Sequence, residues 1–118
     1  MIHEEKKAAK IIEELTMYFL SVGATKLHTG IQKEETKIIL TFDSNYAPEY
    51  EEDVKTLDKY LHEPKNDGLA DIYWELAGSG DPGESSQLLL VGMMVDSAEI
   101  EWKPNGVCLK LVKEMGES

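Results

Sequence analysis

Histidine and cysteine supply much of the nucleophilic and metal-binding chemistry of proteins, and this chain has few of either. Its three histidines, His3, His28 and His62, lie far apart and form no close-spaced ligand pair. His28 falls in a predicted strand, where a surface position is preferred to a ligand role. His62 follows a predicted helix, whose C-terminal end favours a cation. The spacing therefore predicts no metal site.

Cys108 is the only cysteine, so an intramolecular disulfide is impossible. It lies where apolar and polar residues alternate, which predicts a small buried residue rather than a reactive thiol. The sequence contains no nucleophile-elbow pattern, no P-loop and no glycine-rich dinucleotide motif after a strand. The recognisable motifs of acyl transfer and of common nucleotide-binding folds are thus missing.

The loop GSGDPG, at residues 78–83, could offer backbone N–H groups to a phosphate where the next helix begins. Glu84 follows it directly and would repel a phosphate. No Lys or Arg lies between Lys65 and Lys103 to offset that repulsion. A polar surface loop is therefore the preferred interpretation of these glycines.

Hydrophobic periodicity predicts the elements that would position such groups. Residues 4–22 repeat apolar side chains at helical spacing and are followed by Gly23, which predicts a helix with one buried face. Residues 25–43 read as two strands, TKLHTGI and TKIILTFD, with the turn at residues 32–35. Gly30 could mark a bulge in the weaker first strand.

Pro48 suits the first turn of a second helix, whose predicted buried positions are Tyr50, Val54, Leu57 and Leu61. Its acidic stretch at residues 49–58 could contact a basic partner, although a solvated face is preferred. Residues 69–77 read as a short helix. Trp102, further on, is interpreted as a core residue rather than as part of an aromatic surface.

The apolar run LLLVGMMV, at residues 88–95, is the most ambiguous segment. Periodicity cannot separate a strand from a helix in so short a run. Its Leu and Met residues favour a helix, and Ser85 or Ser86 can cap the start, so a helix is preferred. The alternation on both sides of KPNG then predicts a β-hairpin.

The chain has 118 residues, of which 42% are hydrophobic, and is expected to form a single domain over residues 1–118. The order of elements predicts an α/β two-layer sandwich, in which a mixed, mostly antiparallel sheet of about four strands is covered on one face by three or four helices. The net charge of −11 argues against nucleic acid and against an anionic membrane. Without an apolar signal segment or membrane helix, a cytoplasmic protein is expected.

Two parts of the chain resemble the histidine-kinase-like ATPases, also called the GHKL or Bergerat fold, and especially their small anti-sigma-factor serine kinases. Near the C-terminus, the apolar run is followed by Asp96 and by a hairpin that ends in LKLVK. Near the N-terminus, IIEELTMYFLSVGA is similar to the E-L-x-x-N-x-x-x-H-G helix, and two strands end at Asp43, where the family has D-x-G-x-G. The resemblance covers about residues 10–46 and 83–113. It implies that the first and last helices pack side by side on one face of the sheet.

The resemblance also implies roles for particular residues. Glu14 matches a glutamate that activates a water or hydroxyl, and Asp43 matches the aspartate that contacts adenine. Tyr18 replaces the asparagine that holds magnesium, and a phenol is a poor substitute for an amide carbonyl as a ligand. From the residues alone, Glu14 also reads as a surface glutamate on an acidic helix, and Asp43 as a turn residue that ends a strand.

Glycines of the family motifs are replaced as well. Asn45 and Ala47 stand where glycines let the backbone turn under the base, and Ser85 and Gln87 stand where glycines bind phosphate. Loss of the metal ligand together with the phosphate-loop glycines predicts a pseudo-enzyme, with no catalytic residue, cofactor or metal. Such a domain would act as a regulatory domain, through a protein partner or as a homo-oligomer.

Two alternatives remain open. The chain could be a divergent ATP-binding anti-sigma-type serine kinase that uses magnesium, with Glu14 as its catalytic residue. It could also be an unrelated small α/β domain. Retained nucleotide binding predicts a cleft beside Tyr18, Asp43 and residues 78–87, whereas a pseudo-enzyme predicts that the Tyr18 ring fills this space.

Overall fold

A computed structural model describes residues 4–64, 66, 68–69 and 85–115, and the side chains of residues 85–87 are not described. The elements are α1 Glu4–Ser21, β1 Leu27–Lys33, β2 Lys37–Asn45, η1 Pro48–Tyr50, α2 Glu51–Lys55, α3 Leu57–Leu61, α5 Ser85–Met94, β3 Ser97–Lys103 and β4 Gly106–Glu114. The predicted short helix at residues 69–77 falls, beyond Leu69, outside the described residues, as does the glycine loop at residues 78–83.

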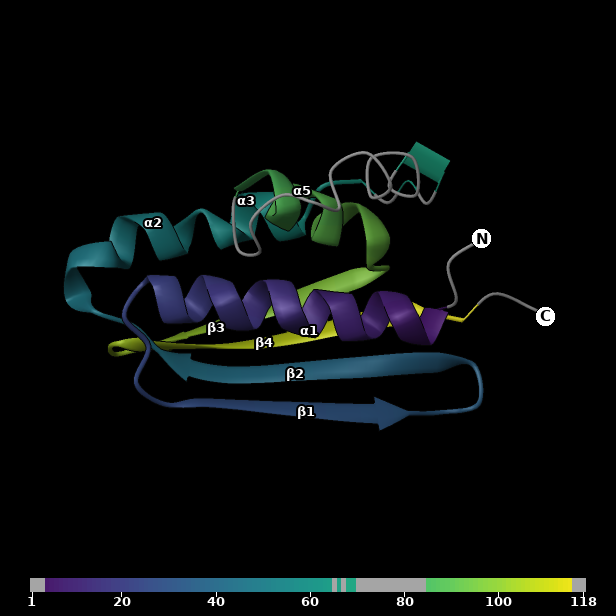
Figure 1. Ribbon diagram of the computed structural model, residues 1–118, viewed down its shortest axis with the longest axis horizontal. Helices are drawn as coiled ribbons and strands as arrows, with labels where there is room; N and C mark the ends of the chain where they lie inside the picture. The colour runs from purple at the N-terminus through teal and green to yellow at the C-terminus, as the bar shows by residue number, and fades with distance from the viewer. Residues whose placement is uncertain (1–3, 65, 67, 70–84, 116–118) are drawn as a thin grey trace.

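The four strands form one open sheet in the order β1-β2-β4-β3, and all three pairings are antiparallel. The described helices lie on a single face of this sheet, with α1 running along it below α2, α3 and α5 (Figure 1). This arrangement confirms the predicted α/β two-layer sandwich. We call the face of the sheet turned away from the helices the far face.

Side-chain alternation along the two central strands separates the faces. In β2, Ile38, Leu40 and Phe42 are buried under the helices, whereas the intervening Thr41 and Asp43 are exposed. The inward residues of β4, which include Leu109 and Leu111, complete the floor of the core. Period-2 alternation therefore turns every second side chain of these strands to the far face, where polar residues predominate although Ile39 and Val112 are apolar.

The first and last helices close the core. Ile11, Leu15 and Phe19 form the buried stripe of α1, and the chain leaves that helix through Gly23, whose φ is +86°. The apolar run is the helix α5, as preferred from its sequence. It lies beside α1 on the same face of the sheet (Figure 1). Buried residues occur on several sides of α5, because it is packed against both α1 and α3.

The prediction of a bulge at Gly30 is wrong, because the ladder between β1 and β2 is unbroken from Leu27 to Lys33. A Cβ atom at Gly30 would lie 2.6 Å from Thr41 Oγ1, so glycine leaves room there for the Thr41 hydroxyl on the neighbouring strand. The predicted turn was also placed slightly early. It lies around residues 34–36, where the Glu34 N–H donates to the Lys37 carbonyl at 2.8 Å.

Three burial predictions need correction. Tyr50 is exposed because it ends the 3-10 turn η1 before the buried stripe of α2 and α3 begins. Trp102 is 40% exposed because it lies near the end of β3, an edge strand. Cys108 is half-buried on the far face, where the sheet itself is its main cover. Val54, Leu57 and Leu61 are buried as predicted.

Candidate functional site

The positions to which the resemblance gives roles do not lie together. Glu14 and Tyr18 are buried in α1, on the helix side of the sheet. Asp43 is exposed on the far face. Ser85 and Gln87 fall in the first turn of α5, where their side chains lie outside the described part of the chain.

Tyr18 is held firmly on the helix side. Its hydroxyl donates to Asp53 Oδ1 at 3.3 Å, and its ring meets Phe19 edge-on, with 5.7 Å between the ring centroids. Burial, followed by the negative charge of Asp53, raises the pKa of the Tyr18 phenol well above its ordinary value. The phenol is therefore neutral at physiological pH and serves as a hydrogen-bond donor.

Glu14 is more deeply buried than a surface glutamate would be, with 1% of its area exposed. The prediction that Glu14 is a surface residue on the solvated face of α1 is therefore wrong. A general base must come within hydrogen-bond reach of the group that it deprotonates. In this conformation packing closes Glu14 off from solvent.

Asn45 has a structural task at the end of β2. Its Oδ1 accepts hydrogen bonds from the N–H groups of Thr25, at 2.8 Å, and Lys26, at 3.1 Å. Its Nδ2 donates to Thr25 Oγ1 at 2.8 Å. These bonds fasten the segment that enters β1 against the end of β2, so the amide of Asn45 is already used within the fold.

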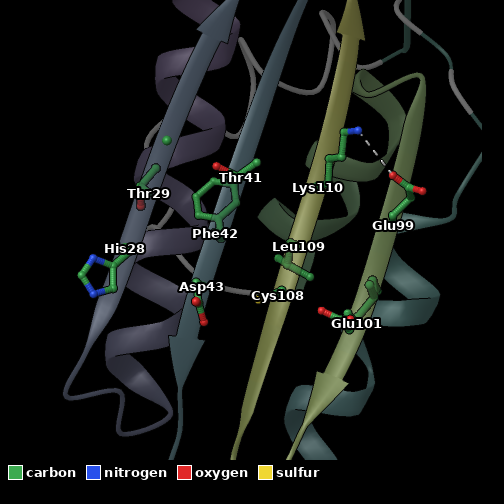
Figure 2. Close-up of a pocket in the computed structure, with 12 residues that line it drawn as sticks. His28, Thr29, Thr41, Phe42, Asp43, Glu99, Glu101, Cys108, Leu109 and Lys110 are labelled. Atoms are coloured by element: carbon green, nitrogen blue, oxygen red, sulfur yellow. Dashed lines mark ion pairs between the residues drawn. The ribbon is translucent and has the colours of Figure 1, made fainter.

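A shallow hollow of about 680 Å³ lies on the far face, between the four strands (Figure 2). The strand register places four chemically active side chains in one row across it: His28, Asp43, Cys108 and Glu101. We call these four residues the polar row. Sequence reasoning missed the polar row, because its members come from four strands whose register the sequence does not reveal.

Ion pairs balance much of the charge on the far face. Lys103 Nζ lies 3.7 Å from Asp43 Oδ2, and Lys110 Nζ lies 3.9 Å from Glu99 Oε2. A hydrogen bond with the Cys108 thiol, and then the charge of Asp43, raise the pKa of Lys103, which keeps it protonated. Each of these lysines thus faces an acid, so the hollow offers no surplus of positive charge for a phosphate.

The polar row does not converge on a reacting centre. The His28 ring points outward, away from Cys108 (Figure 2). Among residues 4–64, 66, 68–69 and 85–115, no group of three or more His, Cys, Asp or Glu side chains could hold a metal ion. The far face is therefore a mixed polar surface of a kind that can contact water or another protein.

A buried lysine joins three elements on the helix side. Lys113, in β4, is 1% exposed, and its Nζ donates to the Met94 carbonyl at 2.9 Å and lies 2.8 Å from Glu4 Oε2. The ammonium group thus meets both the C-terminal end of α5 and a carboxylate at the start of α1. Lys113 thus links β4 to one end of each of these two helices.

Within the described part of the chain, no helix is both long enough and apolar enough to cross a membrane. The sequence matches no protein-family model, and comparison with curated proteins and with solved structures likewise found no match.

Proposed function

We propose that this chain is a non-catalytic regulatory domain that acts through protein contacts, with an ATPase-like fold in which nucleotide binding has been lost or weakened. One observation carries the proposal: Tyr18 and Asp43 lie on opposite sides of the sheet. A nucleotide whose base touched Asp43 would lie on the far face, whereas Tyr18 and Glu14, where its phosphates are expected, are buried on the helix side. The two halves of the expected site are thereby separated.

The chemistry at each half supports the same proposal. The phenol of Tyr18 takes the place of a magnesium ligand and is committed to the Asp53 carboxylate. Glu14, the candidate base, is closed off from solvent. Bound ATP would also add about four negative charges to a chain of net charge −11, which metal ions or clustered cations would have to offset.

The packing of α1 beside α5 on one face of the sheet supports the resemblance from which the ATPase-like fold is proposed. The regulatory role rests on the likeness to anti-sigma kinases, whose work includes binding a protein. The proposal keeps the expectations of a cytoplasmic domain that binds neither nucleic acid nor membrane. Its partner is a protein or a second copy of the chain.

The melting temperature of the purified protein, with and without millimolar Mg-ATP or Mg-ADP, tests the loss of nucleotide binding. A ligand that binds the folded state must stabilise it, by about 2.7 kcal/mol at one hundred times its Kd. We expect no change in melting temperature. A rise that Asp43→Ala abolishes, and that Glu101→Ala on the same face leaves intact, would overturn the proposal in favour of a divergent nucleotide binder.

A further inference from the structure

We propose that β1 is a pairing edge through which the chain binds a second copy of itself, the two β1 strands running antiparallel about a two-fold axis at Gly30. The inference deepens the proposed function, on which it rests, by naming the contact surface and the partner. It follows from the hydrogen-bonding direction of β1, from the exposed apolar surface beside that strand and from the symmetry of its sequence.

The backbone of β1 presents half of its polar groups outward. The Lys26 carbonyl accepts from the Asn45 N–H at 3.2 Å, and the Glu34 N–H donates to the Lys37 carbonyl at 2.8 Å. In an antiparallel pair, hydrogen bonding to one neighbour alternates along the strand. Even-numbered residues of β1 therefore bond to β2, and the backbone groups of the others point away from it. These outward residues are Leu27, Thr29, Ile31 and Lys33.

The two edges of the sheet are not equivalent. On the other edge strand, β3, the Ala98 carbonyl is 2.9 Å from His62 Nε2, at the end of α3. A helix end thus lies against β3 and obstructs an incoming strand there. Exposed edges are templates for further strand pairing, which makes β1 the more open template of the two.

Apolar surface lies directly beside this edge. Ile31 is 61% exposed, the largest exposed fraction among the large hydrophobic side chains of the described residues. It borders a hollow of about 350 Å³ between α1 and β1, which is lined by Ala8, Ala9, Ile12 and Ile38 and flanked by the ion pair of Glu5 with Lys33. A partner strand on β1 would cover Ile31 and close this hollow.

The sequence of β1 is complementary to itself. The strand extends three residues to either side of Gly30, so a two-fold axis there pairs Leu27 with Lys33 and Thr29 with Ile31. All four outward residues then find outward partners, which is the pattern of an isologous interface. A shift of the axis by one residue, which changes the register by two residues, would leave the outward groups of Leu27 or of Lys33 unpaired at the strand end.

The local pattern of charges along β1, unlike the net charge of the chain, favours a second copy as the occupant. Residues 24–33 contain Lys26 and Lys33 but no acidic residue, in a chain of net charge −11, whereas Glu34 and Glu35 follow directly. With the axis at Gly30, Lys26 of each copy lies opposite Glu34 of the other, and no two like charges face each other. Opposite charges placed directly across antiparallel strands stabilise the pairing.

Sedimentation velocity of the full chain between about 1 µM and 500 µM tests the proposal, a range that spans ordinary dimer affinities. We expect a dimer whose population grows with concentration. Ile31→Lys should weaken association at least tenfold, whereas the control Trp102→Lys, which changes an exposed apolar residue of β3, should not. A monomer throughout the range, or a dimer that only the control disrupts, overturns the proposal.

Charge reversal tests the register itself. Lys26→Glu and Glu34→Lys should each weaken the dimer, because each places like charges opposite one another, and the double variant should restore it.

Amide hydrogen exchange tests the same register independently: raising the protein concentration should slow exchange at Leu27, Thr29, Ile31 and Lys33. Even-numbered amides of β1, already bonded to β2, should change little. Equal slowing at even and odd positions, or no rescue by the double variant, contradicts this register.

The outcomes separate this inference from the proposed function. A monomer that does not respond to Mg-ATP removes the second copy but leaves a domain that binds another protein. A dimer that Mg-ATP stabilises keeps the pairing edge but overturns the loss of nucleotide binding.

Discussion

At the residue scale, Tyr18 shows that the helix side of the sheet is occupied by packed side chains. Its ring packs against Phe19, and its hydroxyl is bonded to Asp53, so the side chain belongs to the core. An asparagine in place of Tyr18 would leave a cavity under α2 and would not move Asp43 from the far face. We therefore regard Tyr18 as part of the packing that holds α2 against α1.

His62 predicts a pH dependence of stability. Its Nδ1 lies 2.7 Å from the Asp58 carbonyl and its Nε2 lies 2.9 Å from the Ala98 carbonyl, so the protonated ring can donate to both. The Asp58 carbonyl first, and then the Ala98 carbonyl, raise the pKa of His62 in the folded state. This stabilisation is complete below the unfolded pKa of about 6.5 and is lost as pH rises through the higher folded value.

Urea denaturation at several pH values measures this effect. The difference in unfolding free energy between the native chain and His62→Gln should be largest at about pH 5.5 and should shrink towards pH 8.5. His28→Gln is the matched control, since it removes an imidazole on the far face that does not join α3 to β3. A difference for His62→Gln that stays constant, or that grows with rising pH, would rule out the doubly donating imidazolium.

At the scale of elements, Gly92 sets how closely α5 approaches α3. A Cβ atom there would lie 1.9 Å from the Tyr60 carbonyl oxygen. Helix propensity alone favours Gly92→Ala by about 1 kcal/mol. The clash destabilises the variant, because neither the Tyr60 backbone nor the buried helix α5 can move freely. We expect this effect to exceed the gain in helix propensity and to give a net destabilisation of about 1–3 kcal/mol.

Denaturant unfolding of Gly92→Ala decides between these two effects. Ala9→Gly, at an exposed position of α1, measures the propensity difference in the same chain and should cost about 1 kcal/mol. If Gly92→Ala were more stable than the native chain, the two helices would lie further apart than the structure places them.

The sequence predicted elements better than it predicted their surroundings. The stripe of α1 and the hairpin of β3 and β4 were recognisable, because local periodicity alone specifies them. The environments of Gly30 and Trp102 were not, because strand register and position at the sheet edge decide them. The exposure of a side chain on an edge strand depends on which helices or loops pack over it, and these come from distant parts of the chain.

The same limit applied to the candidate site. In β2, Ile38, Ile39 and Leu40 are consecutive apolar residues, so the sequence alone did not reveal which alternate set faces the helices. Only the structure places Asp43 on the far face, where it joins the polar row. A nucleotide motif read along the chain could therefore name residues but could not show that they converge.

At the scale of the whole molecule, the charge of −11 sets how the chain responds to salt. An excess of one sign destabilises the compact state and opposes the approach of a second copy. Exposed ion pairs such as Lys110 with Glu99 contribute little individually, typically about 0–1 kcal/mol. When salt is added, the stabilisation gained by screening the overall repulsion should therefore exceed the stabilisation lost from the local ion pairs.

We expect both the melting temperature and the dimer affinity to rise when NaCl increases from about 20 mM to 500 mM, as the screening length falls from roughly 20 Å to 4 Å. Thermal melts and sedimentation at the two concentrations measure this response. Glu52→Gln, at an exposed position of α2, is a useful comparison, because it removes one negative charge at a site away from β1 and should reduce the response to salt. A melting temperature that falls with salt would mean that local ion pairs outweigh the repulsion. Dimer affinity that falls while the melting temperature rises would assign the association to its intermolecular pairs of Lys26 with Glu34.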